Sequence, residues 1–345
     1  MRALVLTGPG EAEVQEVPVP VAGPGDVVVD VERVGICGTD VELFTGEMAY
    51  LHDGRTTYPV RPGHEWSGTV TAVGDGVDTG WLGHRVTGDT MLGDGTCRRC
   101  TRGRQHVCEH RDELGIRDGR PGALAEQLSV PATSLHRLPD GVDALLCALV
   151  EPGGNSLRAA QAAASGPDDR VLVVGPGTIG LLTAMFLRCT GAEVHLLGQS
   201  PPSMDFARSL GFEHVWADAS LPGLPFDTVV DASNASSSPA YALDLVEPGG
   251  RVVYVGLAGG PSLVDTRTLA LKDVTAVGIL SASPGLPGTI RAYAAAEVDP
   301  RPLVAATVGL DEVGGVLAGK RPAGAGAGPK IHVDPRRRPR SSSDV

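Results

Sequence analysis

Four residues in the first half of the chain offer the side-chain types that bind a catalytic metal ion. Cys37 offers a thiolate, His64 an imidazole, and Glu65 and Glu151 offer carboxylates. Zinc takes these three ligand types in proteins, and all of them are deprotonated near neutral pH when the metal is bound. Taken singly, each residue has a simpler interpretation: a small buried cysteine, a core or turn histidine, or an acid at the start of a helix. The residue types alone leave these alternatives open.

A second group of metal-binding residue types is compact in the sequence. Three cysteines follow an aspartate in the order Asp94-x2-Cys97-x2-Cys100-x7-Cys108. Six cysteines in 345 residues are too few for a disulfide scaffold, so metal ligation in a reducing compartment is the better interpretation. Three thiolates and one carboxylate can form a closed tetrahedral zinc site, which leaves no position for a substrate. The alternative is a metal-free loop with reduced thiols.

A glycine-rich turn after Val174 has the pattern of a dinucleotide-binding loop. The apolar run 171–174 leads directly into Gly175-Pro-Gly177-Thr178-Ile179-Gly180, and a helical stretch through Arg188 follows. In such a loop the first glycine permits the turn, the second lets the backbone approach a pyrophosphate, and the third lets helix and sheet pack closely. The N–H groups at the helix start then face the anion. We therefore expect these residues to bind a nicotinamide dinucleotide.

The residue that closes the next predicted strand, Gly198, bears on which dinucleotide binds. An acid there would accept hydrogen bonds from the ribose 2′-OH of NAD and repel the 2′-phosphate of NADP. Here Gly198, Gln199 and Ser200 offer amide and hydroxyl donors instead, which favours NADP. No arginine follows immediately, so a site that uses either cofactor is the alternative. On this interpretation, an aspartate introduced at position 198 should shift preference toward NAD.

These sites must be positioned by two kinds of structure. Up to about Pro152 the sequence has short alternating runs such as 26–31 and 68–73, which predict a barrel-like β domain. From about Asn155 it has mainly apolar runs separated by helix-length stretches, which predict a parallel sheet covered on both faces. These runs lie at 171–174, 194–197, 228–231, 252–255 and 274–280. A predicted helix at 289–297 and predicted strands at 303–307 and 330–333 are expected to return the chain to the first domain. The predicted domains are therefore 1–154 with 288–334, and 155–287, followed by a disordered tail at 335–345.

Composition excludes several classes of protein. The chain has 29 basic and 41 acidic residues, a net charge of −12, which argues against a nucleic-acid-binding body. None of its lysines, Lys272, Lys320 and Lys330, lies in a P-loop, and there is no G-x-S-x-G nucleophile motif. No apolar run is long enough to cross a membrane, and Met1–Thr7 lacks a signal-peptide pattern. A cytoplasmic protein without membrane or nucleic-acid partners is the expectation.

Several motifs together resemble one enzyme family. The segments are Cys37-Gly-Thr-Asp, Tyr58-Pro-Val-Arg-Pro-Gly-His-Glu-Trp-Ser-Gly68, the Val73-Gly74 turn, Glu151-Pro152 and the Gly175 loop. Their order and spacing resemble those of the zinc-dependent medium-chain dehydrogenases, in particular the polyol branch with sorbitol, threonine and glucose dehydrogenases. The resemblance covers the chain from Met1 to Asp334. It implies an α/β protein with a GroES-like β-rich catalytic domain and a Rossmann domain with a doubly wound parallel sheet.

The resemblance also implies roles for single residues. Cys37, His64 and Glu65 would be ligands of a catalytic zinc, and Glu151 would take the fourth position directly or through water. Thr39 would accept the proton of the substrate alcohol. Apart from the resemblance, the carboxylate of Asp40 is expected to orient His64. Asp94, Cys97, Cys100 and Cys108 would bind a structural zinc, although relatives with that zinc have cysteine at the first position. At position 42 many relatives have a histidine that ends the proton relay, whereas this chain has Glu42, a weaker base.

The sequence thus predicts a zinc-dependent NAD(P) oxidoreductase that interconverts a secondary alcohol of a polyol, sugar or amino-cyclitol with its ketone. Two alternatives compete with this interpretation: a non-enzymatic zinc-ribbon module with an arginine-rich tail that binds an anionic partner, and a zinc-independent reductase of the same superfamily. The first leaves Gly175–Gly180 and His64-Glu65 unexplained, and the second leaves the four catalytic ligands unexplained. Relatives pair through edge strands, so a homodimer or homotetramer is expected, with 273–280 as the candidate strand.

Overall fold

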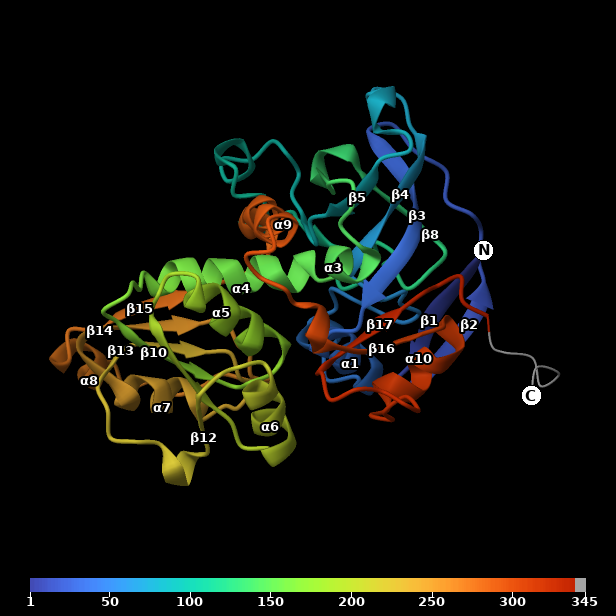
Figure 1. The fold of residues 1–345 in the computed structure, drawn as a ribbon. Helices are drawn as coiled ribbons and strands as arrows, with labels where there is room; N and C mark the ends of the chain where they lie inside the picture. Colours follow the sequence, from blue (N-terminus) through green and yellow to red (C-terminus); the bar gives the residue numbers. More distant parts are fainter. Residues whose placement is uncertain (339–345) are drawn as a thin grey trace. The chain divides into compact units, whose positions relative to one another are not determined.

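The computed structural model describes residues 1–338, and these form two compact units (Figure 1). Unit 1 contains Met1–Glu151, Val304–Gly326 and the chain from Lys330 onward, and unit 2 contains Pro152–Leu303 and Ala327–Pro329. The predicted return to the first domain, at residue 288, is earlier than the observed one. The reason is that α9 (Leu286–Ala294) packs inside unit 2, where the ring of Tyr293 stacks on Phe186 at 6.2 Å between centroids.

Unit 1 is built around a sheet with the strand order β16-β17-β3-β4-β5-β9, in which β8 also pairs with β3. Strand β3 is central because it pairs with β17, β4 and β8. Its residues Val27, Val29 and Val31 share one face and are almost fully buried in the core. The strands of this unit are β1 (Arg2–Gly8), β2 (Glu11–Glu16), β3 (Asp26–Gly35), β4 (Glu65–Val73), β5 (Arg85–Gly88), β6 (Met91–Leu92), β7 (Asp112–Glu113), β8 (Gln127–Pro131), β9 (Leu135–Arg137), β16 (Val304–Val308) and β17 (Lys330–Val333). Its helices are α1 (Gly38–Thr45), α2 (Ala49–His52), α3 (Ala144–Ala148) and α10 (Leu310–Leu317).

The C-terminal part of the chain completes unit 1. Strand β17 pairs antiparallel with β3, so the red end of the chain lies beside a blue strand in Figure 1. The predicted disordered tail begins at Pro335. Its first four residues are described, and in them Arg336 pairs with Asp30 and Arg338 with Glu126, each at 2.8 Å. The rest of that tail lies outside the described residues.

Unit 2 contains a six-stranded sheet of order β12-β11-β10-β13-β14-β15, and all neighbouring strands are parallel. This is the predicted doubly wound sheet, and α5 and α7 cover opposite faces of it in Figure 1. Its strands are β10 (Arg170–Val174), β11 (Glu193–Leu197), β12 (His214–Trp216), β13 (Phe226–Asp231), β14 (Val246–Tyr254) and β15 (Thr275–Gly278). The other helices are α4 (Val150–Ala163), which begins at the unit boundary, α5 (Thr178–Arg188), α6 (Pro201–Ser209), α7 (Ser238–Leu245) and α8 (Thr266–Leu271).

One strand of the sheet in unit 2 was not predicted, and the helices can be checked for membrane-spanning length. Strand β12 was not predicted, because its three residues His-Val-Trp are too short for a recognisable pattern. Within residues 1–338, every helix falls short of the length and apolar character needed to span a membrane.

Candidate active site

The pairing of β3 with β4 brings the first predicted metal ligands together. Gly35 lies opposite Glu65 in this pair, so Cys37, two residues beyond the end of β3, and His64, just before β4, meet at the same end of the ladder. The ligand atoms of Cys37, His64 and Glu65 all lie within 4.8 Å of one another. A side chain at Gly35 would place its Cβ 2.1 Å from Glu65 Oε2, so glycine is needed there to leave room for the carboxylate.

Asp40 ties the two ligand-bearing segments to each other. Its carboxylate accepts hydrogen bonds from the backbone N–H groups of Cys37, at 2.9 Å, and Gly63, at 3.1 Å. Its Oδ1 also lies 3.7 Å from His64 Nδ1, in the place expected for a residue that orients this ring. Burial raises the pKa of Asp40. Burial lowers the pKa of His64, but Asp40 and then Cys37 outweigh it, and the pKa of His64 is raised well above its ordinary value.

Lys330 is the neighbour of this cluster that sequence reasoning missed. From β17, its Nζ donates to both carboxylate oxygens of Glu65 at 2.7 Å and to the carbonyl of Ile36 at 2.9 Å. Both charged side chains are almost fully buried. Burial lowers the pKa of Lys330, but the Glu65 carboxylate outweighs it and the pKa is raised, so the ammonium is charged at neutral pH. The available signal was a lysine at the start of a predicted strand, at 330–333.

Glu151 lies at the first turn of α4 and is not one of the three residues within 4.8 Å. It is buried, and it is close enough that its charge helps to raise the pKa of His64. The buried hydroxyl of Thr90 donates to Glu151 Oε1 at 3.3 Å, a contact the sequence did not predict. Thr90 therefore restricts where this carboxylate can point.

Thr39 and Glu42 lie on α1, next to the cluster. The Cys37 thiol lies 3.9 Å from Thr39 Oγ1, which places the hydroxyl beside the predicted ligands. Glu42 is one helical turn further along, on the same side of the helix. Its partial burial and then Glu47 raise its pKa, which makes it a better base than an exposed glutamate.

The residues present fit a divalent cation. A thiol and three buried carboxylates, those of Asp40, Glu65 and Glu151, gather around the cluster, and Lys330 compensates only part of this negative charge. The buried Nδ1 atom of His64 has no hydrogen-bond partner among the described residues. Mixed sulfur, nitrogen and oxygen donors of this kind are those that zinc prefers. Cys37, His64, Glu65 and Glu151 could therefore hold it.

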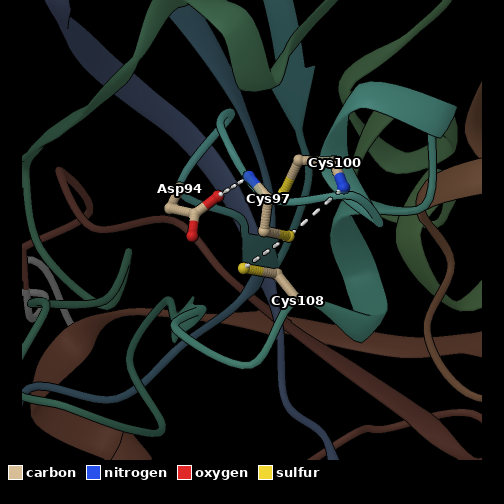
Figure 2. Close-up of side chains that lie close together, drawn as sticks. All are labelled: Asp94, Cys97, Cys100 and Cys108. Carbon is tan, nitrogen blue, oxygen red and sulfur yellow. Dashed lines mark hydrogen bonds between the residues drawn. The ribbon is translucent and has the colours of Figure 1, made fainter.

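The second predicted cluster also assembles (Figure 2). The ligand atoms of Asp94, Cys97, Cys100 and Cys108 lie within 4.8 Å of one another, and the sulfur atoms of Cys97 and Cys108 are 3.7 Å apart. One oxygen of Asp94 accepts the N–H of Cys97 at 3.0 Å, which leaves the other oxygen available for a metal. The backbone N–H of Cys100 lowers the pKa of Cys97, whereas burial raises the pKa of Cys100 to about 12. A bound cation would be needed to hold all three as thiolates.

Cys100→Ser should therefore mainly reduce stability. We expect zinc content to fall by about one equivalent per chain and the melting temperature to fall by roughly 4 °C or more, or about 1–2 kcal/mol, because the loop loses its cross-link. Metal analysis and differential scanning calorimetry measure both effects. Cys189→Ser, which changes an exposed cysteine of unit 2, is the matched control. Unchanged zinc content and melting temperature in Cys100→Ser would show that the loop is metal-free.

The glycine-rich loop of unit 2 has the geometry that dinucleotide binding requires. Gly175 adopts a φ of +93°, which favours glycine, and a Cβ at Gly180 would lie 2.0 Å from the carbonyl oxygen of Gly175. A Cβ at Gly177 would meet no atom within 4 Å, so this face of the loop is open. The first helical bond of α5 is from Leu181 N–H to the Gly177 carbonyl, so the N–H groups of residues 178–180 are not used within the helix. These N–H groups are available to an anion, so the loop could hold a pyrophosphate.

The residues predicted to face the adenosine ribose follow β11. Gly198 is the first residue after the strand and donates its N–H to the carbonyl of Trp216 at 2.9 Å. Gln199 and Ser200 are exposed, and Ser200 is the N-cap of α6. No acidic side chain occupies these three positions, as the sequence indicated.

A third group of metal-binding types, Glu193, His195 and His214, lies on β11 and β12 of unit 2. Trp216 Nε1–H donates to His195 Nδ1 at 2.9 Å, so the proton of the neutral ring is on Nε2, which donates to Glu193 at 2.7 Å. Both ring nitrogens are thus engaged. The rings of His195 and His214 are stacked at 4.4 Å, a parallel arrangement that does not direct their lone pairs to one metal. The hydrogen bonds and the stacking explain this group without a metal.

Two family models match this chain. The model of the alcohol dehydrogenase GroES-like domain matches residues 23–140, and that of the zinc-binding dehydrogenases matches residues 178–297. An L-threonine 3-dehydrogenase from Rhizobium etli (strain CIAT 652) is 32% identical over 295 residues, which cover 81% of this chain and 83% of that protein. Another, from Chelativorans sp. (strain BNC1), is 34% identical with the same coverage.

Solved structures agree with this assignment. Alcohol dehydrogenase TADH from Thermus sp. ATN1 has a TM-score of 0.86 at 26% identity, over 97% of this chain and 99% of that one. A chain from Sinorhizobium meliloti 1021, solved with NADP bound, has the same TM-score and coverage at 27% identity. The predicted fold class is confirmed, and so is the prediction of an enzyme rather than a zinc-ribbon interaction module. The chain belongs to the zinc-dependent medium-chain dehydrogenases, in the branch that includes the polyol and threonine dehydrogenases, and is an NAD(P) alcohol dehydrogenase.

Proposed function

We propose that this enzyme interconverts a secondary alcohol of a polyol, sugar or amino-cyclitol with its ketone, and that it uses NADP in preference to NAD. The buried cluster of Cys37, His64 and Glu65, with Glu151 nearby, is the observation that carries the proposal. The relatives named L-threonine 3-dehydrogenase add L-threonine, itself a secondary alcohol, to the candidate substrates. A cytoplasmic location is part of the same proposal and is consistent with free thiols at the predicted ligands.

The proposed reaction needs hydride transfer, proton transfer and correctly held ligands, and different residues provide for each. When bound, zinc would lower the pKa of the substrate hydroxyl, and the oxidised nicotinamide would accept hydride from the carbon. Thr39, beside Cys37, is positioned to accept the hydroxyl proton, and Glu42 can pass it to water because its pKa is raised. Asp40 holds the segments of Cys37 and His64 together through hydrogen bonds from the Cys37 and Gly63 N–H groups. Thr90 holds the Glu151 carboxylate through its hydroxyl.

A substrate panel tests the proposal. The enzyme would be incubated with L-threonine, sorbitol and other polyols, aldoses and amino-cyclitols, each with NADP and with NAD, and formation of the reduced nicotinamide would be followed by absorbance. We expect turnover with at least one secondary alcohol, and a higher kcat/KM with NADP. Turnover restricted to primary alcohols would contradict the substrate class, and a strong preference for NAD would contradict the cofactor assignment.

We further propose that the chain forms a homodimer or homotetramer through β15. This strand is the last of the six-stranded sheet, so one of its edges has unpaired backbone groups within unit 2. Exposed leucines lie near it in sequence, among them Leu271, which is 72% exposed. Light scattering at micromolar concentration should give twice or four times the chain mass. A monomer under these conditions would contradict the proposal.

A further inference from the structure

Gly198 directly follows β11, and two other side chains already occupy the space where its side chain would lie. A Cβ at this position would lie 2.8 Å from Cγ and 3.2 Å from Cδ of Pro176, and 2.9 Å from Cγ of Met204. The backbone of Gly198 is outside the left-handed region, so its conformation would accept any residue. Glycine is therefore required at this position by lack of space rather than by backbone conformation.

Of the two obstructing side chains, Pro176 is the one that cannot move away. Methionine can adopt another rotamer, whereas the proline ring is fixed to its own backbone. That backbone lies between Gly175 and Gly177, and the Gly175 N–H donates to the carbonyl of Leu197 at 2.9 Å. This hydrogen bond joins the glycine-rich loop to the end of β11. Pro176 is thus held against Gly198 by the same loop that forms the pyrophosphate cradle.

This contact determines what chemistry can face the ribose. A carboxylate at the end of β11 is the group that would bind the 2′-OH of NAD and repel the 2′-phosphate of NADP. The space left by Pro176 accepts no Cβ, and therefore no carboxylate. The neighbouring donors are uncharged: Gln199 and Ser200 are exposed, while the nearest arginine along α6, Arg208, is engaged by Asp205 at 2.8 Å and by the carbonyl of Val215 at 3.0 Å.

We propose that Pro176 constrains the cofactor specificity of this enzyme through position 198: it leaves no room for a side chain there, so the ribose site stays without an acidic residue and open to a 2′-phosphate. The inference rests on the proposed use of NADP and adds its physical origin. Pro176 acts through position 198 and is a positioning residue rather than a catalytic one. It follows that exchanging Gly198 alone cannot convert the cofactor preference cleanly, because an aspartate there has no room.

Four variants test this: Gly198→Asp, Pro176→Ala, the double variant Pro176→Ala/Gly198→Asp, and Met204→Ala/Gly198→Asp as the matched control. For each, the melting temperature and the Kd values for NADPH and NADH, from nicotinamide fluorescence, would be measured. Pro176→Ala should keep the wild-type ratio of the two Kd values within about threefold. Gly198→Asp should melt several degrees lower and bind both cofactors weakly, because a crowded loop is strained. The Pro176→Ala double variant should recover most of the melting temperature and shift the ratio toward NADH by at least tenfold.

Three outcomes would overturn the inference. Gly198→Asp alone could keep wild-type stability and shift the ratio fully, which would show that Pro176 is no obstacle. The double variant Met204→Ala/Gly198→Asp could regain as much melting temperature, and shift the ratio of Kd values as far, as Pro176→Ala/Gly198→Asp. That would show that Met204 is the residue that limits the space at position 198. The Pro176→Ala double variant could remain as unstable as Gly198→Asp. Failure of the proposed function can be told apart from failure of this inference by the wild-type enzyme alone. In that case the wild type would bind neither cofactor, or would strongly prefer NADH.

Discussion

His64→Ala is expected to remove the catalytic zinc and to lower kcat/KM by about 10³-fold or more. The imidazole is one of three ligand groups within 4.8 Å, and its loss leaves the thiol and carboxylates without the nitrogen donor. Polarisation of a substrate oxygen by a bound metal contributes several kcal/mol to the transition state, and each 1.4 kcal/mol is tenfold in rate. Metal analysis and steady-state kinetics measure the two effects. The glycine-rich loop belongs to unit 2, so cofactor binding should remain near the wild-type level.

The matched control is His84→Ala, which removes an exposed imidazole from the same unit. It should retain zinc and activity. Near-normal activity of His64→Ala protein after treatment with a chelator would contradict the zinc mechanism. A fall in cofactor affinity equal to the fall in activity would show instead that the substitution disturbs the whole fold.

Much of the architecture could be predicted because it depends on local patterns. The strands of unit 2 are buried on both faces, and the run 171–174 is therefore continuously apolar and easy to recognise. The run 228–231 is as deeply buried but keeps only two valines between a threonine and an aspartate. In β3 the segment 29–32 alternates valine with an acidic residue, and its two valines lie on the face that enters the core. The end of unit 2 was less predictable, because α9 is an amphipathic helix whose sequence does not say which unit it packs against.

The candidate ligands could be predicted as residues, and the structure adds why they meet. Cys37 and His64 flank two strands whose register places Gly35 opposite Glu65, and neither the register nor the need for glycine there is visible in the residue types. Contacts between distant segments were beyond sequence reasoning. The partner of Glu65 is 265 positions away, and the contact of Pro176 with Gly198 depends on how closely two loops of the sheet approach.

The buried pair of Glu65 and Lys330 gives the largest expected effect on stability. Lys330→Met removes a side chain that donates to both oxygens of Glu65 and leaves a carboxylate that is 1% exposed without its cation. Breaking such a pair by removing one partner costs about 3–5 kcal/mol. For a unit of this size that is a fall in melting temperature of roughly 10 °C, measurable by calorimetry. Lys320→Met makes the same change at an exposed lysine and should have little effect.

A second comparison separates the charge from the packing. In Lys330→Met/Glu65→Gln no uncompensated charge remains, so most of the lost stability should return. Zinc provides a further test, because a bound divalent cation would itself compensate Glu65. We therefore expect that zinc raises the melting temperature of Lys330→Met by more than it raises that of the wild type, with chelator-treated protein as the reference. An equal rise in both proteins would show that Glu65 does not interact with the metal, and would leave Cys37, His64 and Glu151 as the candidate ligands.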